Sequence, residues 1–199
     1  MLEVATSIDA EVVALELHEL EVTEPRGDFD GEVARVERDA RAGRVAEPGP
    51  ARALYRRFGV DPTRYRPSSE ALLRRVRRGG GLPRVNSLVD IANVVSLRLQ
   101  VPVGLYDLAL VEGKLEVRLG LDGEAYAGIG KDTVSVDGRI CVSDALGPCG
   151  NPSADSARTM ITTATERAAW IFFLPVAKTD VRWTYELVAR YGRGLVRVP

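Results

Sequence analysis

Residue types that perform nucleophilic or metal chemistry are scarce in this chain. It has one histidine, His18, and two cysteines, Cys141 and Cys149, that do not form a CxxC pair. Serine and cysteine hydrolases need an imidazole beside the nucleophile, and zinc sites need several His or Cys ligands. His18 alternates with Leu15 and Leu17 and points away from their face, so we expect a solvated strand residue. The sequence therefore predicts catalysis without histidine, metal or cofactor, and reduced, structural cysteines.

Cationic chemistry is concentrated in one segment. Residues 1–50 carry a net charge of −8, residues 51–84 a net charge of +8, and the remainder −1. Guanidinium groups bind phosphates in a bidentate manner, so the arginine-rich segment predicts an RNA-backbone surface. The alternative is that its arginines pair with the acidic first segment. The arginines predicted to contact RNA are Arg74, Arg75, Arg77, Arg78 and Arg84.

Composition excludes several classes of protein. The chain has 199 residues, of which 45% are hydrophobic and 28% charged, as in ordinary globular proteins. Its longest apolar run, 168–177, is too short to span a membrane and contains Pro175. The acidic N-terminus does not resemble a secretory signal, so we expect a cytoplasmic location. The segment at 128–131 lacks the first glycine and the Ser or Thr of an ATP-binding loop, which excludes that motif.

Hydrophobic periodicity and turn residues predict the elements that position these groups. We expect strands at 2–6 and 12–22, helices at 29–42 and 52–58, and a helix at 70–78 capped by Ser68. A helix at 88–99, capped by Asn86, is apolar nearly all round and should be buried; its Asp90 and Asn93 are expected to fix loops rather than contact substrate.

Short strands dominate after residue 101. They are expected at 115–119, 124–127, 133–136, 139–143 and 169–174, with a hairpin at Asp137 and Gly138. A final helix is expected to begin at Asp180 and run through Arg190. The order predicts an α+β fold, with a mixed β-sheet core of short strands and flanking helices.

Three motifs resemble one known domain. They are the segments 67–75, 82–93 and 101–108, and the likeness continues through Val117-Arg118, Ser143-Asp144, Gly147-Pro148 and 162–165. This pattern resembles the B3/B4 domain of the phenylalanyl-tRNA synthetase beta subunit, and more closely the free-standing proteins built from that domain alone. We therefore expect residues 60–199 to form the B3/B4-like domain, with residues 1–59 packed on it as a strand and helix segment.

The resemblance implies an activity and a pocket. In the synthetase the domain inspects aminoacyl-tRNA and hydrolyses the ester of a wrongly attached amino acid, tyrosine on phenylalanine tRNA being the known error. The pocket lies between the segments that match 102–107 and 147–165. Gly104 stands where the synthetase carries a histidine, and its glutamate falls near Ala157 or Arg158. The predicted pocket residues are Gly104, Leu105, Tyr106, Gly147, Pro148 and Asp155.

An aminoacyl ester is activated, so positioning a water and stabilising the oxyanion can hydrolyse it. The predicted catalytic groups are the hydroxyls of Thr162, Thr163 and Thr165 and the carboxylate of Asp144. The alternative is that these hydroxyls bond backbone, that Tyr106 belongs to the core and that Asp107 fixes a turn.

The sequence thus predicts a trans-editing hydrolase of mischarged aminoacyl-tRNA, with tRNA or aminoacyl-tRNA as partner and no role for DNA or a membrane. Two alternatives remain open. One is a noncatalytic RNA-binding or interaction module, and the other is a pocket that binds an amino acid without RNA.

Overall fold

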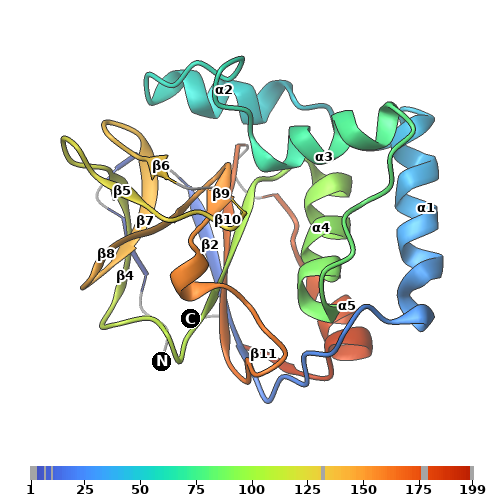
Figure 1. Cartoon of the computed structure of the whole chain (residues 1–199). Helices are drawn as coiled ribbons and strands as arrows, with labels where there is room; N and C mark the ends of the chain where they lie inside the picture. The colour runs from blue at the N-terminus through green and yellow to red at the C-terminus, as the bar shows by residue number, and fades with distance from the viewer. Residues whose placement is uncertain (1–3, 7, 10, 131–132, 176–178, 198–199) are drawn as a thin grey trace.

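The computed structural model describes residues 4–6, 8–9, 11–130, 133–175 and 179–197, and arranges them in three layers (Figure 1). A group of helices covers one face of a four-stranded sheet, and a five-stranded sheet covers its other face. The predicted α+β architecture of short strands with flanking helices is confirmed.

The four-stranded sheet is the central layer. Its order is β11 (Leu195–Arg197), β2 (Val12–His18), β10 (Ala168–Phe173) and β3 (Val103–Asp107), and every pair is antiparallel. The strand β10 is buried on both faces, with Trp170 in the core beneath the helices and Ile171 in the core beneath the second sheet. A strand covered on both sides must be apolar at every position, which explains the continuous apolar run.

The five-stranded sheet forms the outer β layer. Its order is β1 (Val4–Thr6), β4 (Leu115–Leu119), β7 (Ile140–Asp144), β8 (Gly147–Asn151) and β9 (Ala154–Asp155). Only β1 and β4 pair in parallel among these described strands. A separate ribbon joins β5 (Ala125–Tyr126) to β6 (Val134–Ser135).

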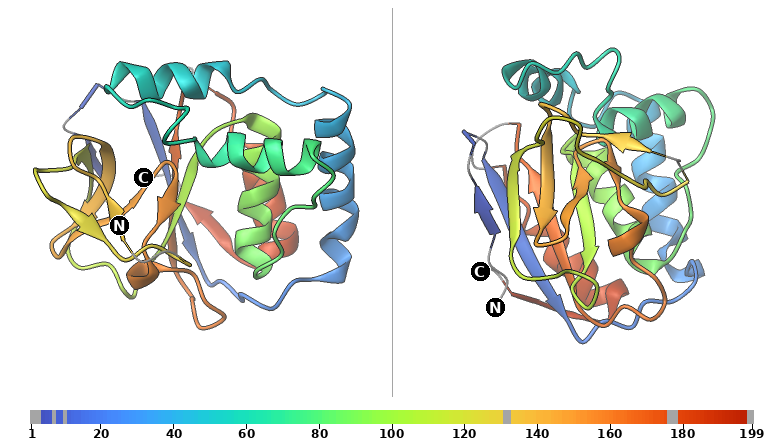
Figure 2. Two further views of the ribbon diagram at one scale, coloured as in Figure 1. Left: turned by 45° about the horizontal axis from the view of Figure 1, so that its top comes forward. Right: turned by 60° about the vertical axis from the view of Figure 1, so that its left-hand side comes forward.

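Helices α1 (Asp30–Arg41), α3 (Ser68–Arg77), α4 (Ser87–Leu99) and α5 (Trp183–Leu187) form the third layer, and Figure 2 shows them on one side of the sheets. A π-helical turn, Val188–Gly192, extends α5, and short 3-10 helices cover Gly27–Phe29 and Ala157–Thr159. Helix α2 (Gly49–Arg57) contributes Leu54 to the core between the two sheets.

Helix α4 has the predicted cap and the predicted burial. The Asn86 side chain accepts a hydrogen bond from the Val89 backbone N–H, and most of the helix is buried. The reason is its central position, since it contacts α1, α3, α5 and β3. An apolar helix surrounded by other elements has no face left for solvent.

Three local predictions need correction. Asp137 and Gly138 form a turn, but β6 pairs with β5 whereas β7 pairs with β4 and β8, so the turn joins two sheets instead of closing a hairpin. Ser68 is the first residue of α3 and makes no capping hydrogen bond. Asp180 accepts a hydrogen bond from the Arg182 N–H, but the helix begins at Trp183.

The first 59 residues supply β2, which lies between β11 and β10 in the central sheet. Over the described ranges, none of the helices combines the length and apolar character needed to cross a membrane.

Candidate ligand pocket

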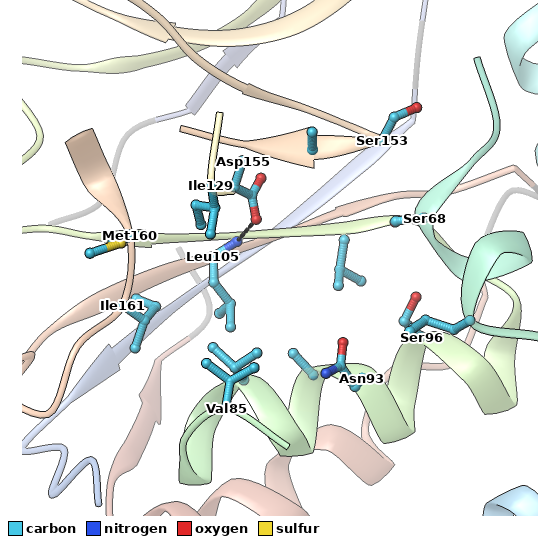
Figure 3. Close-up of a pocket in the computed structure, with 15 residues that line it drawn as sticks. Ser68, Val85, Asn93, Ser96, Leu105, Ile129, Ser153, Asp155, Met160 and Ile161 are labelled. Atoms are coloured by element: carbon cyan, nitrogen blue, oxygen red, sulfur yellow. Dashed lines mark hydrogen bonds between the residues drawn. The ribbon is translucent and has the colours of Figure 1, made fainter. Parts of the chain in front are cut away.

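An apolar cavity of about 280 Å³ lies between the start of α3, one face of α4, and strands β3 and β9. Figure 3 shows its lining side chains. Val85, Ile129 and Met160 at the cavity are exposed by 52%, 50% and 38%, so apolar side chains surround its opening. The other apolar lining residues are Leu72, Val89, Ala92, Val103, Leu105, Ala154 and Ile161, and the polar ones are Ser68, Asn93, Ser96, Ser153 and Asp155.

Strand β3 presents alternate residues to the two sides of the central sheet. Val103 and Leu105 line the cavity, whereas Tyr106 belongs to the core between the sheets. Because side chains alternate along a strand, Gly104 faces the same way as Tyr106. Among the predicted pocket residues that the structure describes, only Leu105 and Asp155 line the cavity.

Gly104 is closely covered by Tyr106. A Cβ built at position 104 would overlap the Tyr106 hydroxyl and lie 2.8 Å from its Cζ. A histidine at this position therefore has no room while Tyr106 keeps its place.

Asp155 brings a carboxyl group to the cavity wall. Its Oδ2 accepts a hydrogen bond from the Leu105 N–H at 3.4 Å, which links β9 to the edge of β3 (Figure 3). Burial raises the pKa of Asp155 to about 7, and the Leu105 N–H and the nearby Tyr106 hydroxyl oppose this shift. The carboxyl group is consequently mainly uncharged at pH values well below 7.

Asn93 faces the cavity from α4. Its Nδ2 donates a hydrogen bond to the Pro83 carbonyl at 3.3 Å, and Figure 3 shows its side-chain oxygen turned toward the open space. This arrangement leaves Oδ1 as an acceptor for a ligand. Asn93 therefore both fixes a loop, as predicted, and lines the pocket, which the prediction missed.

Asp90, one turn away, has only the predicted structural contacts. Its Oδ2 accepts a hydrogen bond from Arg84 Nε at 2.6 Å, and its Oδ1 accepts one from the Val85 N–H at 2.8 Å. The signal that separates the two residues is position on the helix. Asn93 shares the cavity face with Val89 and Ser96 at helical spacing, and Asp90 does not.

The three serines at the cavity differ in how well they are satisfied. Ser96 donates to the Val101 carbonyl at 2.8 Å. Ser153 accepts from the Tyr55 hydroxyl at 2.6 Å and donates to the Arg66 carbonyl at 2.9 Å. The Ser68 hydroxyl is buried and has no hydrogen-bond partner among the described residues.

The predicted threonine cluster forms a turn outside the cavity lining. Thr165 donates to Asp107 Oδ2 at 2.7 Å and accepts from the Thr162 N–H at 3.0 Å. Thr162 Oγ1 accepts from the Ala164 N–H, and Thr163 is exposed. These are the backbone and turn contacts of the alternative interpretation, and Asp107 fixes its turn as that interpretation expects.

Asp144 is engaged on both oxygens. Arg158 donates to Oδ1 and Oδ2, each at 2.8 Å, and the N–H groups of Glu112 and Leu146 donate to the same carboxylate. Burial acts to raise the pKa of Asp144, but these hydrogen bonds outweigh it and hold the pKa below its ordinary value. Gly147 and Pro148 begin β8 beside this cluster, and none of the three lines the cavity.

The predicted RNA-binding arginines fall into two groups. Arg84 bonds Asp90, Asp30 and the Arg26 carbonyl. Arg75 donates to the Gly81 carbonyl, and Arg77 donates to the Ala40 carbonyl and lies 3.5 Å from Glu47. Arg74 and Arg78 are exposed, and their guanidinium groups make no hydrogen bond or ion pair with the described residues. Some arginines of the segment therefore pair with the acidic first segment, as the alternative expected, and others keep free guanidinium groups, which the RNA-binding prediction requires.

His18 contributes nothing to the cavity lining. Its side chain is 16% exposed and its Nε2 lies 3.1 Å from Glu16 Oε1, which corrects the prediction of a solvated residue. Within the described ranges, no group of three His, Cys, Asp or Glu side chains is arranged to hold a metal ion.

Comparison with known proteins identifies the family. The model of the B3/4 domain matches residues 50–188, and this chain belongs to that family. It is 37% identical over 76 residues to the phenylalanine--tRNA ligase beta subunit of Rhodopseudomonas palustris and 39% identical over 71 residues to that of Ralstonia nicotianae, matches that cover 38% and 36% of this chain. The chain spans 9% of the length of each of these curated relatives.

A solved structure has the same fold. It is an N-terminal fragment of the phenylalanyl-tRNA synthetase beta subunit from Pyrococcus horikoshii, with a TM-score of 0.50 and 12% identity. The match covers 98% of this chain and 50% of that fragment.

Proposed function

We propose that this chain binds the aminoacyl end of a tRNA in the cavity and hydrolyses its ester in trans. The observation that carries the proposal is the cavity itself, an apolar space with a few isolated polar groups, in a chain of the B3/4 family. Such pockets bury the apolar part of a ligand and orient it through a few hydrogen bonds. The relatives named above are tRNA ligases, which supports an aminoacyl-tRNA as the source of the ester.

The polar groups suit the fragments of an amino-acid ester. The Asn93 oxygen can accept a hydrogen bond from an ammonium group or from water, and the unpartnered Ser68 hydroxyl can donate one to a carbonyl. Asp155 in its neutral form can do both. The side chain of the amino acid would pack on the apolar wall of Val89 and Val103.

Hydrolysis then follows from positioning. The oxygen of a bound water adds to the ester carbonyl carbon, the bond from that carbon to the ribose oxygen breaks, and a water proton passes to the ribose oxygen. Holding the water near the carbonyl, with hydrogen-bond donors near the developing oxyanion, lowers the barrier without an imidazole.

The free arginines of α3 supply the contact with RNA in this proposal. Arg74 lies in α3 and Arg78 caps the C-terminus of that helix, whose first turn reaches the cavity through Ser68. Phosphate contacts made by exposed guanidinium groups would hold the tRNA and give an affinity that falls with salt.

The test is hydrolysis of a panel of mischarged tRNAs by wild type, Val89→Phe and Val111→Phe. Val89 lines the cavity, and a phenyl ring there would occupy it; Val111 is a partly buried valine packed against the other core, and serves as the matched control. Loss of hydrolysis in Val89→Phe alone supports the proposal. Binding of an aminoacyl-adenosine analogue without hydrolysis would leave a noncatalytic binding protein, and absence of both would refute the cavity as the site.

A further inference from the structure

The Tyr106 side chain is fully buried beside the cavity wall, although it does not line the cavity. We propose that the Tyr106 hydroxyl holds the Asp155 carboxyl group in place, which makes Tyr106 a positioning residue for the ligand of the cavity. This inference rests on the proposed function only where it concerns a ligand. The proposed interaction between Tyr106 and Asp155 does not depend on any ligand.

Two glycines create the space for this contact. Gly104 lies beside Tyr106 in β3, and Gly150 pairs with Asp155 across β8 and β9. A Cβ at Gly150 would lie 2.5 Å from the Tyr106 hydroxyl and 3.0 Å from Asp155 Oδ1. Both oxygens therefore lie over the same glycine, and only a residue without a side chain leaves them room.

The hydrogen bonds of the region indicate that the Tyr106 hydroxyl and Asp155 Oδ1 are partners. Asp155 Oδ2 accepts a hydrogen bond from the Leu105 N–H, whereas neither Oδ1 nor the Tyr106 hydroxyl has a hydrogen-bond partner among the described residues. A buried polar atom without a partner is costly. The hydroxyl is thus the donor available to Oδ1, and it anchors the second oxygen of the carboxyl group.

The titratable side chains that interact directly with the pair are uncharged near neutral pH. Tyr126 on β5 and Cys149 on β8 interact with Asp155 and Tyr106, and burial raises the pKa of each, that of Cys149 to about 12, as it raises that of Tyr106 well above its usual value. Charged Arg139 acts on Tyr126, and charged Asp144 and Arg158 act on Cys149, but none of the three is among the groups that shift the pKa of Asp155. Cys141, which neighbours both tyrosines, has a pKa raised to about 11. No described arginine or lysine is among the groups that shift the pKa of Asp155.

Asp155 is consequently the group in this cluster that changes charge near neutral pH. Burial raises its pKa and the Tyr106 hydroxyl lowers it, because the hydroxyl hydrogen bond favours the carboxylate. If Tyr106 positions Asp155, removal of the hydroxyl must raise the pKa of Asp155 and shift any binding profile that depends on it to higher pH.

The experiment follows the Asp155 carboxyl carbon by NMR in ligand-free, carbon-13-labelled protein, with Asp155→Asn used to assign the signal. Wild type is compared with Tyr106→Phe, and with Tyr191→Phe as the matched control. Tyr191 is also buried, but it packs against Phe29 in the helical core. We expect Tyr106→Phe to raise the pKa of Asp155 by about one pH unit, the size of one hydrogen bond to a charged group, and Tyr191→Phe to leave it unchanged.

A second measurement covers the case in which Tyr106→Phe does not fold. In wild type, the Cζ carbon signal of Tyr106 should change with pH at the midpoint of the Asp155 titration, because the hydroxyl contacts the titrating group. The inference would be overturned if both Phe variants changed the pKa of Asp155 equally. It would also be overturned if the Tyr106 Cζ signal did not change as Asp155 titrates.

The role of Tyr106 toward a ligand is tested by a separate binding measurement. Binding of a nonhydrolysable aminoacyl-adenosine analogue should keep its affinity in Tyr106→Phe at low pH, where Asp155 is neutral in both proteins, and its pH profile should move upward with the pKa. A uniform loss at every pH would mean that Tyr106 acts only on packing and would overturn the positioning role. If wild type binds no analogue, the proposed function fails, and the NMR result on the pair remains decisive by itself.

Discussion

Replacement of Asp155 by Asn should make the protein less sensitive to alkaline pH. An Asn side chain has the shape of the neutral carboxyl group, and its oxygen can still accept the Leu105 N–H. In the wild type, burial raises the pKa of Asp155 from 3.8 to about 7. The folded state then binds the proton more tightly than the unfolded state, so this group favours folding at low pH, and that contribution is lost as pH rises toward 7.

The expected magnitude follows from the size of the shift. Three pKa units correspond to about 4 kcal/mol over the whole pH window, of which roughly 3 kcal/mol falls between about pH 5 and about pH 8.5. We expect the free energy of unfolding of Asp155→Asn, taken relative to that of wild type, to be roughly 3 kcal/mol higher at about pH 8.5 than at about pH 5.

Urea unfolding at the two pH values, on wild type, Asp155→Asn and Asp122→Asn, measures this difference. Asp122 is an exposed turn residue, so its variant reports the general effect of losing one carboxylate. Other titrating groups cancel in the comparison with wild type. A difference between Asp155→Asn and wild type that is the same at both pH values would show that Asp155 is charged throughout, and would refute the reasoning.

Three further predictions concern packing and charge. Gly104→Ala should lower the free energy of unfolding by about 2 kcal/mol, because its methyl group overlaps the Tyr106 hydroxyl; unchanged urea unfolding would contradict this. Replacing Arg74 and Arg78 together by Ala should reduce the salt slope of tRNA binding by about 2 without changing stability, as titrations at several salt concentrations and urea unfolding would show. Arg84→Ala should instead cost about 3 kcal/mol of stability, since it leaves a buried carboxylate unpaired; a stable variant with weakened tRNA binding would reverse this assignment.

The elements were largely predictable because local signals and tertiary packing agree. Asn86 caps α4, and the apolar run of that helix requires burial on every side, which the central position provides. The Asp137 and Gly138 turn was misassigned for the opposite reason. A turn residue pair indicates where the chain reverses, but it does not determine whether the flanking strands pair with each other or with strands of two sheets.

The arginines show that the net charge of a segment does not predict which of its side chains are free. A net charge of +8 over one segment predicts a basic surface, yet Arg84 and Arg77 point to carboxylates supplied by distant segments. Which guanidinium groups remain free is decided by tertiary structure. Sequence alone could indicate the segment, but it could not separate Arg74 and Arg78 from their neighbours.

The site was harder to predict because strand alternation decides which residue of a motif reaches the cavity. Gly104, Leu105 and Tyr106 were all predicted to line the pocket, but β3 turns Val103 and Leu105 to the cavity and Gly104 and Tyr106 toward the second sheet. Which of two neighbouring residues faces the cavity cannot be predicted until the pairing of β3 with β10 is known.

That alternation also explains how a residue outside the cavity can still control it. Tyr106 faces away from the ligand space, but β9 contacts the edge strand β3 and brings Asp155 to the Leu105 N–H and to the glycine that the Tyr106 hydroxyl also covers. Its carboxyl group contacts the Leu105 N–H on the strand edge, and its second oxygen lies over Gly150 with the Tyr106 hydroxyl. A substitution on the far face of β3 is therefore expected to change the pH at which the cavity wall becomes charged, without altering any side chain that a ligand touches.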